Sequence, residues 1–203
     1  MKEHSEDKLH GKDKFLSKFQ NYLGEFVYGG IDGSVTTFAV VAGSTGAGLQ
    51  PSVIIILGFA NLIADGFAMS VGSYLSTKSE RDNYRKHEKI EYWEVENLPE
   101  VEREEIREIY REKGFEGELL EKVVEVITAD KDRWVNVMMK EELDMIPEKK
   151  SPLAMGAVTY VSFLVVGLVP LIVYVYDYIS GSVDNNHSFL ISCILTSIAF
   201  IGI

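Results

Sequence analysis

Hydrophobic and polar positions along this chain fall into long blocks. Val53–Thr77 is 25 residues long and carries a single formal charge, at Asp65, which is the length and polarity of a membrane-spanning helix. The residues that follow are rich in Lys, Arg and Glu, yet neither Gly nor Pro occurs between residues 73 and 98. Because nothing ends the helix at the membrane surface, the pattern predicts one helix over Val53–Asn97, a membrane span that continues as a stalk in water.

The predicted span has two special faces. One row at four-residue spacing is small: Ala60, Ala64, Ala68, Gly72 and Ser76. The neighbouring row is polar or soft: Asn61, Asp65, Met69, Ser73 and Thr77. Small residues let another helix approach closely in lipid, so this pair of rows is typical of a helix that lines something other than lipid.

Three more apolar segments indicate further membrane helices. Phe26–Leu49 is the first, with Asp32 as its one charge, and Ala154–Tyr176 is the third, although it contains Gly156, Gly167 and Pro170. His187–Ile203 begins a fourth, which is shorter than the roughly 20 residues needed to cross a bilayer. The fold class that follows is all-α, a polytopic membrane protein.

Between the second and third spans lies a polar insert. Turn residues and apolar spacing predict helices over Pro99–Lys113, Gly117–Thr128 and Asp130–Ile146. We therefore divide the chain into residues 1–19, a charged tail; residues 20–77, spans one and two; residues 78–150, an acidic helical domain that extends the second span; and residues 151–203, span three and the start of span four.

Composition sharpens this division. The mean hydropathy of +0.04 averages two unlike parts, because 22 of the 31 acidic residues lie between Lys78 and Ser151, where the formal charge is −7. Such acidity argues against nucleic acid as a partner. The single cysteine, Cys193, excludes an internal disulfide and a cysteine-based zinc site.

Positive charge sets the expected topology. Lysines crowd before the first span, Lys and Arg follow the second and precede the third, and the turns at 49–52 and 177–187 contain neither. The positive-inside rule therefore predicts that the N-terminus and the acidic insert are cytoplasmic.

Ionisable groups at membrane depth are costly and usually functional. Asp32 and Asp65 each suggest a transport pathway, with Glu25 two helical turns before Asp32 and Met69 one turn after Asp65. Local backbone bonding or pairing with another helix would also explain the two aspartates, and packing would explain the methionine. Oxygen and thioether ligands without thiolate favour iron(II) or manganese(II) over copper or zinc.

Carboxylates in the insert recur one helical turn apart. The pairs are Glu91 with Glu94 and Glu102 with Glu105, and the third insert helix carries Met138, Met139 and Glu142. Carboxylates from several helices are how helical bundles hold iron or manganese. Helices this rich in charge are also commonly just solvated, and that alternative stays open on spacing alone.

Three segments together resemble the vacuolar iron transporter family: IDGSVTTFAVVAG, ADGFAMSVGSYLSTKSE, and the insert with ENLPEVEREEI and VMMKEEL. The resemblance begins near Tyr22. It implies five membrane helices, a homodimer in the lipid bilayer, and export of iron(II) or manganese(II) from the cytosol in exchange for protons, serving metal homeostasis and detoxification.

Residue by residue, the resemblance implies a transport pathway through Asp32 and Met69, with Glu25 at its mouth. It implies an insert metal site that consists of Glu91, Glu94, Glu102, Glu105, Met138, Met139 and Glu142. No permanently bound cofactor is implied, since Fe2+ or Mn2+ is the transported and regulatory ion. The membrane would be the cell membrane in a prokaryote and the vacuolar membrane in a eukaryote.

The chain departs from the family pattern at several points. Ser73 stands where many members have a carboxylate, Asn61 in the same row is also uncharged, and Asp65 is a candidate to compensate. The fifth span is absent, so we expect a fragment or a shortened protein.

We interpret the protein as a transporter that is not an enzyme. Two other functions compete with this interpretation. A membrane-anchored ferritin-like store or ferroxidase would use the same glutamates. It would usually need histidine, and the insert's one histidine, His87, falls outside the glutamate pairs. Alternatively, the insert is a dimerising stalk without metal.

Overall fold

The computed structural model describes residues 20–181 and 185–203, which form eight α-helices and no strand. The predicted all-α class is therefore confirmed. The charged tail expected over residues 1–19 lies outside the described part. The chain divides into two compact units, which we call the membrane unit (up to Ser76 and from Lys150 onward) and the insert (Thr77–Lys149). One helix, α4 (Pro51–Asn97), contributes to both.

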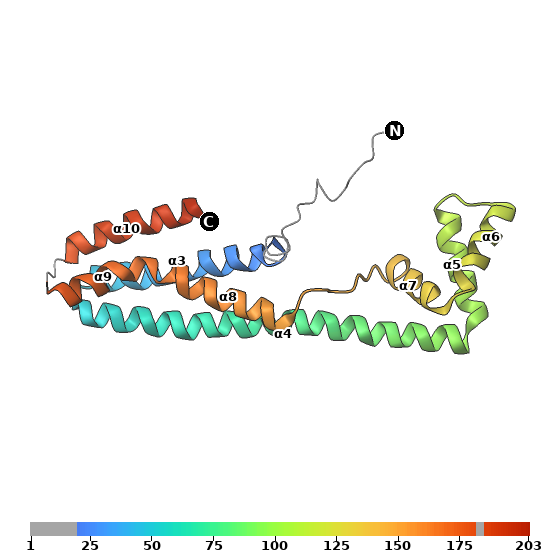
Figure 1. Cartoon of the computed structure of the whole chain (residues 1–203), viewed down its shortest axis with the longest axis horizontal. Coiled ribbons are helices and arrows are strands. Elements are labelled where there is room, and N and C mark those ends of the chain that lie inside the picture. Colours follow the sequence, from blue (N-terminus) through green and yellow to red (C-terminus); the bar gives the residue numbers. More distant parts are fainter. Residues whose placement is uncertain (1–19, 182–184) are drawn as a thin grey trace, which may run out of the picture. The chain divides into compact units, whose positions relative to one another are not determined.

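The membrane unit is built around two crossing helices, α3 (Leu23–Gly46) and α8 (Pro152–Gly167), which lie side by side in Figure 1. Glycine makes the crossing close: a Cβ atom on Gly33 would lie 2.5 Å from the carbonyl oxygen of Phe163. A Cβ atom on Gly29 would lie 2.8 Å from the carbonyl oxygen of Thr159. The Gly29 and Gly33 spacing is the small-residue pattern that lets helix backbones approach in lipid.

Two described helices, α3 and α4, are long and apolar enough to cross a membrane. A third candidate is a broken one, because α8 and α9 (Val169–Ser180) meet at a bend of 50°. The predicted third span, Ala154–Tyr176, thus consists of two helices with a break at Leu168. Pro170 lies in the first turn of α9, where its ring cannot continue the helix before it.

The last two helices of the membrane unit are joined to each other by hydrogen bonds. The last helix, α10 (Asn185–Gly202), contacts α9 and α3. The Ser192 hydroxyl donates to the carbonyl oxygen of Pro170 at 2.7 Å, and Ser188 hydrogen-bonds Asp177. These two bonds fasten α10 to α9 at separate points along its length.

The insert contains α5 (Pro99–Glu112), α6 (Gly117–Thr128), α7 (Lys131–Glu141) and the polar part of α4. Its core consists of Val95, Ile106, Leu120, Val124, Ile127, Trp134, Val135, Met138 and Met139. Gly114, at φ +92°, allows the turn after α5. The Asp130 side chain caps α7 by accepting the backbone N–H of Arg133 at 2.7 Å.

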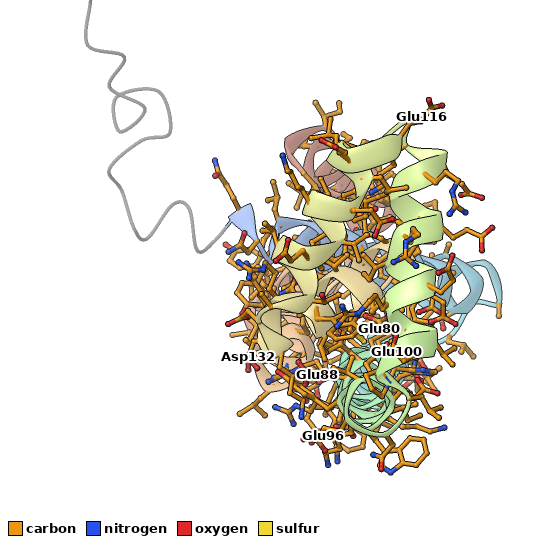
Figure 2. All side chains as sticks on the ribbon, turned by 90° about the vertical axis from the view of Figure 1, so that its right-hand side faces the viewer. Glu80, Glu88, Glu96, Glu100, Glu116 and Asp132 are labelled. Carbon is orange, nitrogen blue, oxygen red and sulfur yellow. The ribbon has the colours of Figure 1, made fainter. Side chains whose placement is uncertain are left out.

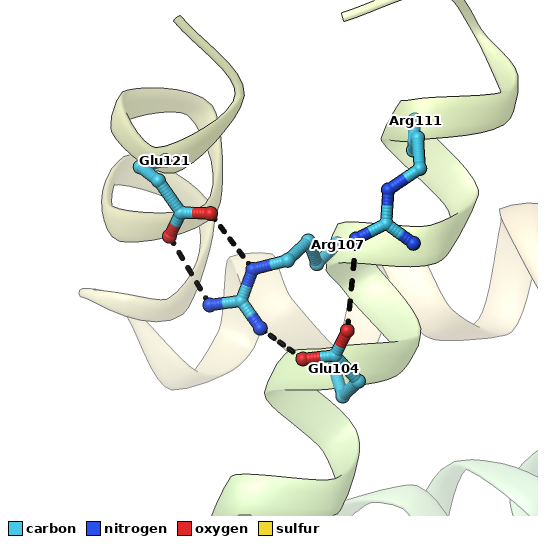
Figure 3. Close-up of polar contacts among 4 residues, drawn as sticks. All are labelled: Glu104, Arg107, Arg111 and Glu121. Atoms are coloured by element: carbon cyan, nitrogen blue, oxygen red, sulfur yellow. Dashed lines mark hydrogen bonds and ion pairs between the residues drawn. The ribbon is translucent and has the colours of Figure 1, made fainter. Parts of the chain in front are cut away.

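An ion-pair network joins α5 to α6 on the surface of the insert (Figure 3). Arg107 donates from Nε and Nη2 to the two carboxylate oxygens of Glu121, at 2.9 and 3.1 Å. It also pairs with Glu104, which Arg111 approaches at 3.7 Å. This two-pronged geometry fixes which faces of α5 and α6 meet.

The third insert helix is shorter than the sequence predicts. It ends at Glu141, whereas the prediction extended it to Ile146, just before Pro147. After Glu141 the chain turns, because Asp144 has φ +50° and the N–H of Met145 bonds the carbonyl oxygen of Met139 at 2.8 Å. Glu142 therefore follows α7 as its C-terminal cap.

Candidate metal sites

The insert brings together carboxylates from three places in the chain. Glu91 and Glu94 come from α4, Glu102 and Glu105 from the first two turns of α5, and Glu142 from the end of α7. Val95 and Ile106 are buried in the shared core, and their packing turns these faces of α4 and α5 inward. The charges of all five groups act on one another, so we call them the glutamate cluster.

Two members of the cluster are almost completely buried. Glu91 is 3% exposed and Glu102 is 4% exposed. Within the described residues, the Oε2 atom of each is buried without a hydrogen-bond partner. A buried carboxylate is strongly destabilising unless it is protonated, paired or bound to a cation. The fold therefore holds two acids in a place that demands a proton or a metal ion.

The electrostatics agree with the burial. Burial, and then the charges of Glu142, Glu94 and Glu105, raise the pKa of Glu91 to about 7. Burial, followed by Glu105, Glu91, Glu94 and Glu142, raises the pKa of Glu102 to about 8. The pKa values of Glu105 and Glu142 are also raised, first because their carboxylates are partly desolvated and then by neighbouring carboxylates. Glu91 and Glu102 therefore titrate close to neutral pH.

The two methionines assigned to the same site lie in the core. Met138 and Met139 are fully buried, with Trp134 and Val135 from the same helix beside them in the core cluster, and Glu142 is exposed. Across residues 20–181 and 185–203, no three His, Cys, Asp or Glu side chains are arranged so that they could hold a metal ion. The glutamate cluster thus brings carboxylates near one another, but their side chains are not arranged around a common metal position in the described structure.

Other acids of the insert behave as an ordinary charged surface. Figure 2 shows Glu96, Glu116 and Asp132 far apart on the outside of the insert helices. Several are paired: Lys131 contacts Glu96, Lys113 contacts Glu141, and the Tyr92 hydroxyl donates to Asp132 at 2.8 Å. For these residues the solvated-surface interpretation holds, and it fails for Glu91 and Glu102 because they are buried.

In the membrane unit, polar groups of α3 and α4 face each other. The carboxylate of Asp32 lies within electrostatic range of that of Asp65. The Asn61 amide, one turn before Asp65, donates to the Thr36 hydroxyl at 3.2 Å, and Thr36 is one turn after Asp32. Met69 packs against the apolar core of this unit. Asn61 and Thr36 therefore join α4 to α3, with Asp32 and the exposed Asp65 one turn away on either helix, and we call these four residues the polar seam.

The remaining pathway residue, Glu25, occupies the first turn of α3. Its Oε1 atom lies 4.0 Å from the Nζ atom of Lys150. Sequence reasoning missed Lys150 and Thr36 as parts of these sites. Thr36 could have been found from its spacing to Asp32, whereas nothing in the sequence links Lys150 to Glu25.

The sequence model of the VIT family matches residues 23–203. The chain belongs to the VIT family. This match covers every described helix from α3 to α10, including both groups of carboxylates. Membership of this family, together with the long apolar helices, indicates that the chain is a membrane protein.

Individual relatives match most of the chain. A vacuolar iron transporter of Plasmodium falciparum is 36% identical over 207 residues, which is 98% of this chain and 75% of the relative. One of Toxoplasma gondii is 36% identical, over 91% of this chain and 63% of the relative. Vacuolar iron transporter 1 of Arabidopsis thaliana is 31% identical, over 74% and 60%. The VIT-family chain described here thus spans less than two thirds of the length of several relatives that it matches.

Proposed function

We propose that this VIT-family protein moves iron(II) or manganese(II) out of the cytosol across a membrane in exchange for protons. The observation that carries the proposal is the pair of buried carboxylates, Glu91 and Glu102, whose inner oxygens have no bonding partner among the described residues. The names of the relatives, vacuolar iron transporters, support iron as the cargo. Manganese is included because it prefers the same oxygen ligands, and a role in metal detoxification is part of the proposal that the family resemblance implies.

In the insert, a dication would bind where the fold concentrates negative charge. It would release the protons that Glu91 and Glu102 hold near neutral pH and offset the repulsion within the glutamate cluster. Glu94, Glu105 and Glu142 would complete the oxygen ligands, with Met138 and Met139 as soft ligands from α7. Binding would draw these side chains together. The insert would then collect metal ions from the cytosol, and its occupancy would follow the cytosolic metal concentration, as expected of a regulatory site.

In the membrane unit, the cargo would pass Glu25 and reach Asp32, Asp65 and Met69. A proton and a metal ion would compete for the same carboxylate oxygens, which is the simplest basis for antiport. Asn61, held by Thr36, would offer its amide oxygen as an uncharged ligand beside these carboxylates. No nucleotide and no enzymatic step is needed.

Assembly and orientation complete the proposal. We place the N-terminus and the insert in the cytoplasm, as the distribution of Lys and Arg predicts. The exposed row of small residues on α4, from Ala60 to Ser76, is suited to close contact with a second copy, which supports a homodimer.

Transport into vesicles tests the function. The protein is reconstituted with a pH gradient, and uptake of Mn2+ or Fe2+ is followed for the unmodified chain, Asp32→Asn, Glu102→Gln and the exposed control Glu100→Gln. We expect no uptake with Asp32→Asn, reduced uptake at limiting metal with Glu102→Gln, and normal uptake with the control. Full activity of Asp32→Asn would reject the membrane pathway, and oxidation of Fe2+ without uptake would favour the ferroxidase alternative.

A further inference from the structure

A contact between two helix starts lies at one end of the membrane unit. Lys150 comes two residues before α8, and its ammonium nitrogen lies 4.0 Å from Oε1 of Glu25 in the first turn of α3. The backbone N–H of Ser151 donates to the hydroxyl of Tyr22 at 3.3 Å. This second contact pins the chain beside Lys150, so the lysine is held near Glu25 by the backbone as well as by charge.

The Glu25 carboxylate is only partly satisfied by this lysine. Its second oxygen, Oε2, is buried and has no hydrogen-bond partner in the described part of the chain. The Glu25 side chain is 21% exposed and the Lys150 side chain 37%. One oxygen therefore faces a flexible cation that can move into solvent, and the other is buried without a hydrogen bond that would satisfy it.

Glu25 lies on the same face of α3 as Asp32, which places its ion pair with Lys150 on the approach to Asp32. Glu25 and Asp32 are seven residues apart on α3, so they share a face about 10 Å apart along the axis. They lie in the half of α3 nearest to the start of α8, where the chain returns from the insert. A cation that approaches Asp32 along this face from that end meets Glu25, and with it Lys150, first.

We propose that Lys150 is a tethered counter-ion that competes with the incoming metal ion for the Glu25 carboxylate. The metal must displace the ammonium group, which swings into solvent on its long stem and returns when the metal has moved on. Lys150 thereby sets the metal concentration at which transport is half-saturated. This inference rests on the proposed function, since it assigns a specificity-determining residue to the same pathway.

The size of the effect follows from the exposure of the pair. An ion pair with access to solvent is weak compared with a buried one, so its removal should shift half-saturation by about two- to five-fold. The direction is fixed by charge: without the competing cation, less metal is needed.

The test compares adjacent lysines in the vesicle assay. Lys150→Gln and Lys150→Met each remove the charge, the second with the apolar stem kept. Lys150→Arg keeps the charge, and Lys149→Gln is the matched control at an exposed neighbour. We expect the Mn2+ concentration for half-maximal uptake to fall about two- to five-fold in both neutral variants, with a smaller change in maximal rate. Lys150→Arg and Lys149→Gln should resemble the unmodified protein.

A second background separates charge competition from a structural role. In Glu25→Gln, adding Lys150→Gln should produce no further shift in half-saturation. A shift of equal size in that background, or unshifted half-saturation in both neutral variants while the unmodified protein transports, would overturn the inference alone. Absence of uptake by the unmodified protein would overturn the proposed function, and this inference with it.

Discussion

Glu91 and Glu102 are carboxylates that the folded insert tolerates at a cost. In the unfolded chain both would ionise near pH 4.5, whereas burial and neighbouring carboxylates move their pKa values to about 7 and about 8 in the fold. The folded state therefore holds protons that the unfolded state has already lost. It follows that the metal-free insert becomes less stable as the pH rises from about 4.5 through about 8.

Glu102→Gln should remove much of this pH dependence. The neutral amide cannot ionise, so at pH 8.5 without metal we expect the variant's insert to be about 1–3 kcal/mol more stable than the unmodified one. The gain should shrink toward pH 5. Hydrogen exchange of residues 99–112 in the purified protein measures it, after correction for the intrinsic effect of pH on exchange.

The exposed residue Glu100 provides the control for that experiment. It lies on the same helix, two residues away, and Glu100→Gln should leave the pH profile unchanged. An unaltered profile in Glu102→Gln would show that the burial of this carboxylate does not govern the stability of the insert.

Sequence reasoning singled out Glu91 and Glu102 as candidate metal ligands, but it did not predict that they are buried. The one-turn spacing of Glu91 with Glu94 and of Glu102 with Glu105 is visible in the sequence. Their burial depends on how α5 packs against α4 through Val95 and Ile106, which is a tertiary event. The ion pair of Glu25 with Lys150 is likewise invisible, since the partners are far apart in the chain.

At the scale of elements, the α3–α8 crossing depends on the absence of side chains. Gly33 is buried against the backbone of Phe163, and a Cβ atom there would lie 2.5 Å from a carbonyl oxygen. Backbone cannot yield as a flexible side chain can, so the helices would have to separate.

Gly33→Ala should therefore destabilise the membrane unit by about 1–3 kcal/mol, the usual cost of overpacking. Thermal unfolding in detergent would show a lower midpoint than for the unmodified protein. The matched control on the same helix is Gly43→Ala, where nothing lies within 4 Å of the added atom. An equal loss in both variants would mean that helix propensity, and not the crossing, sets the effect.

Helix boundaries were predictable where local chemistry decides them. The long α4 helix follows from the absence of Gly and Pro over residues 73–98, and α5 and α6 end as their turn residues indicate. The break between α8 and α9 was missed, although Gly167 and Pro170 were noted. Pro170 marks the place, but the packing of Gly167 against Gly33 and Leu62 shows only in three dimensions.

At the scale of the whole molecule, the exposed small row on α4 makes a homodimer testable. With Cys193→Ser as background, Ala64→Cys should form a disulfide-linked dimer in membranes under mild oxidation, because small residues allow close approach of two helices. Gel electrophoresis without reductant reads the result.

Val165→Cys, on the exposed side of α8, is the comparison for that cross-link. It should remain largely monomeric under the same oxidation. Equal cross-linking at both positions would reflect random collision in the bilayer, and none at Ala64→Cys would exclude this row as the dimer contact.

The break at Pro170 has a mechanical consequence for the molecule. Because α10 is fastened to α9 by the Ser192 and Ser188 hydroxyls, the two helices beyond the break would swing as one lever. The crossing of α3 with α8, which carries Asp32, can stay rigid meanwhile. Both helices also contact α3, and the Thr45 and Tyr174 hydroxyls hydrogen-bond at 2.7 Å, so a turn at Leu168 would also have to slide α9 and α10 along α3, whereas the polar seam between α3 and α4 would keep its geometry.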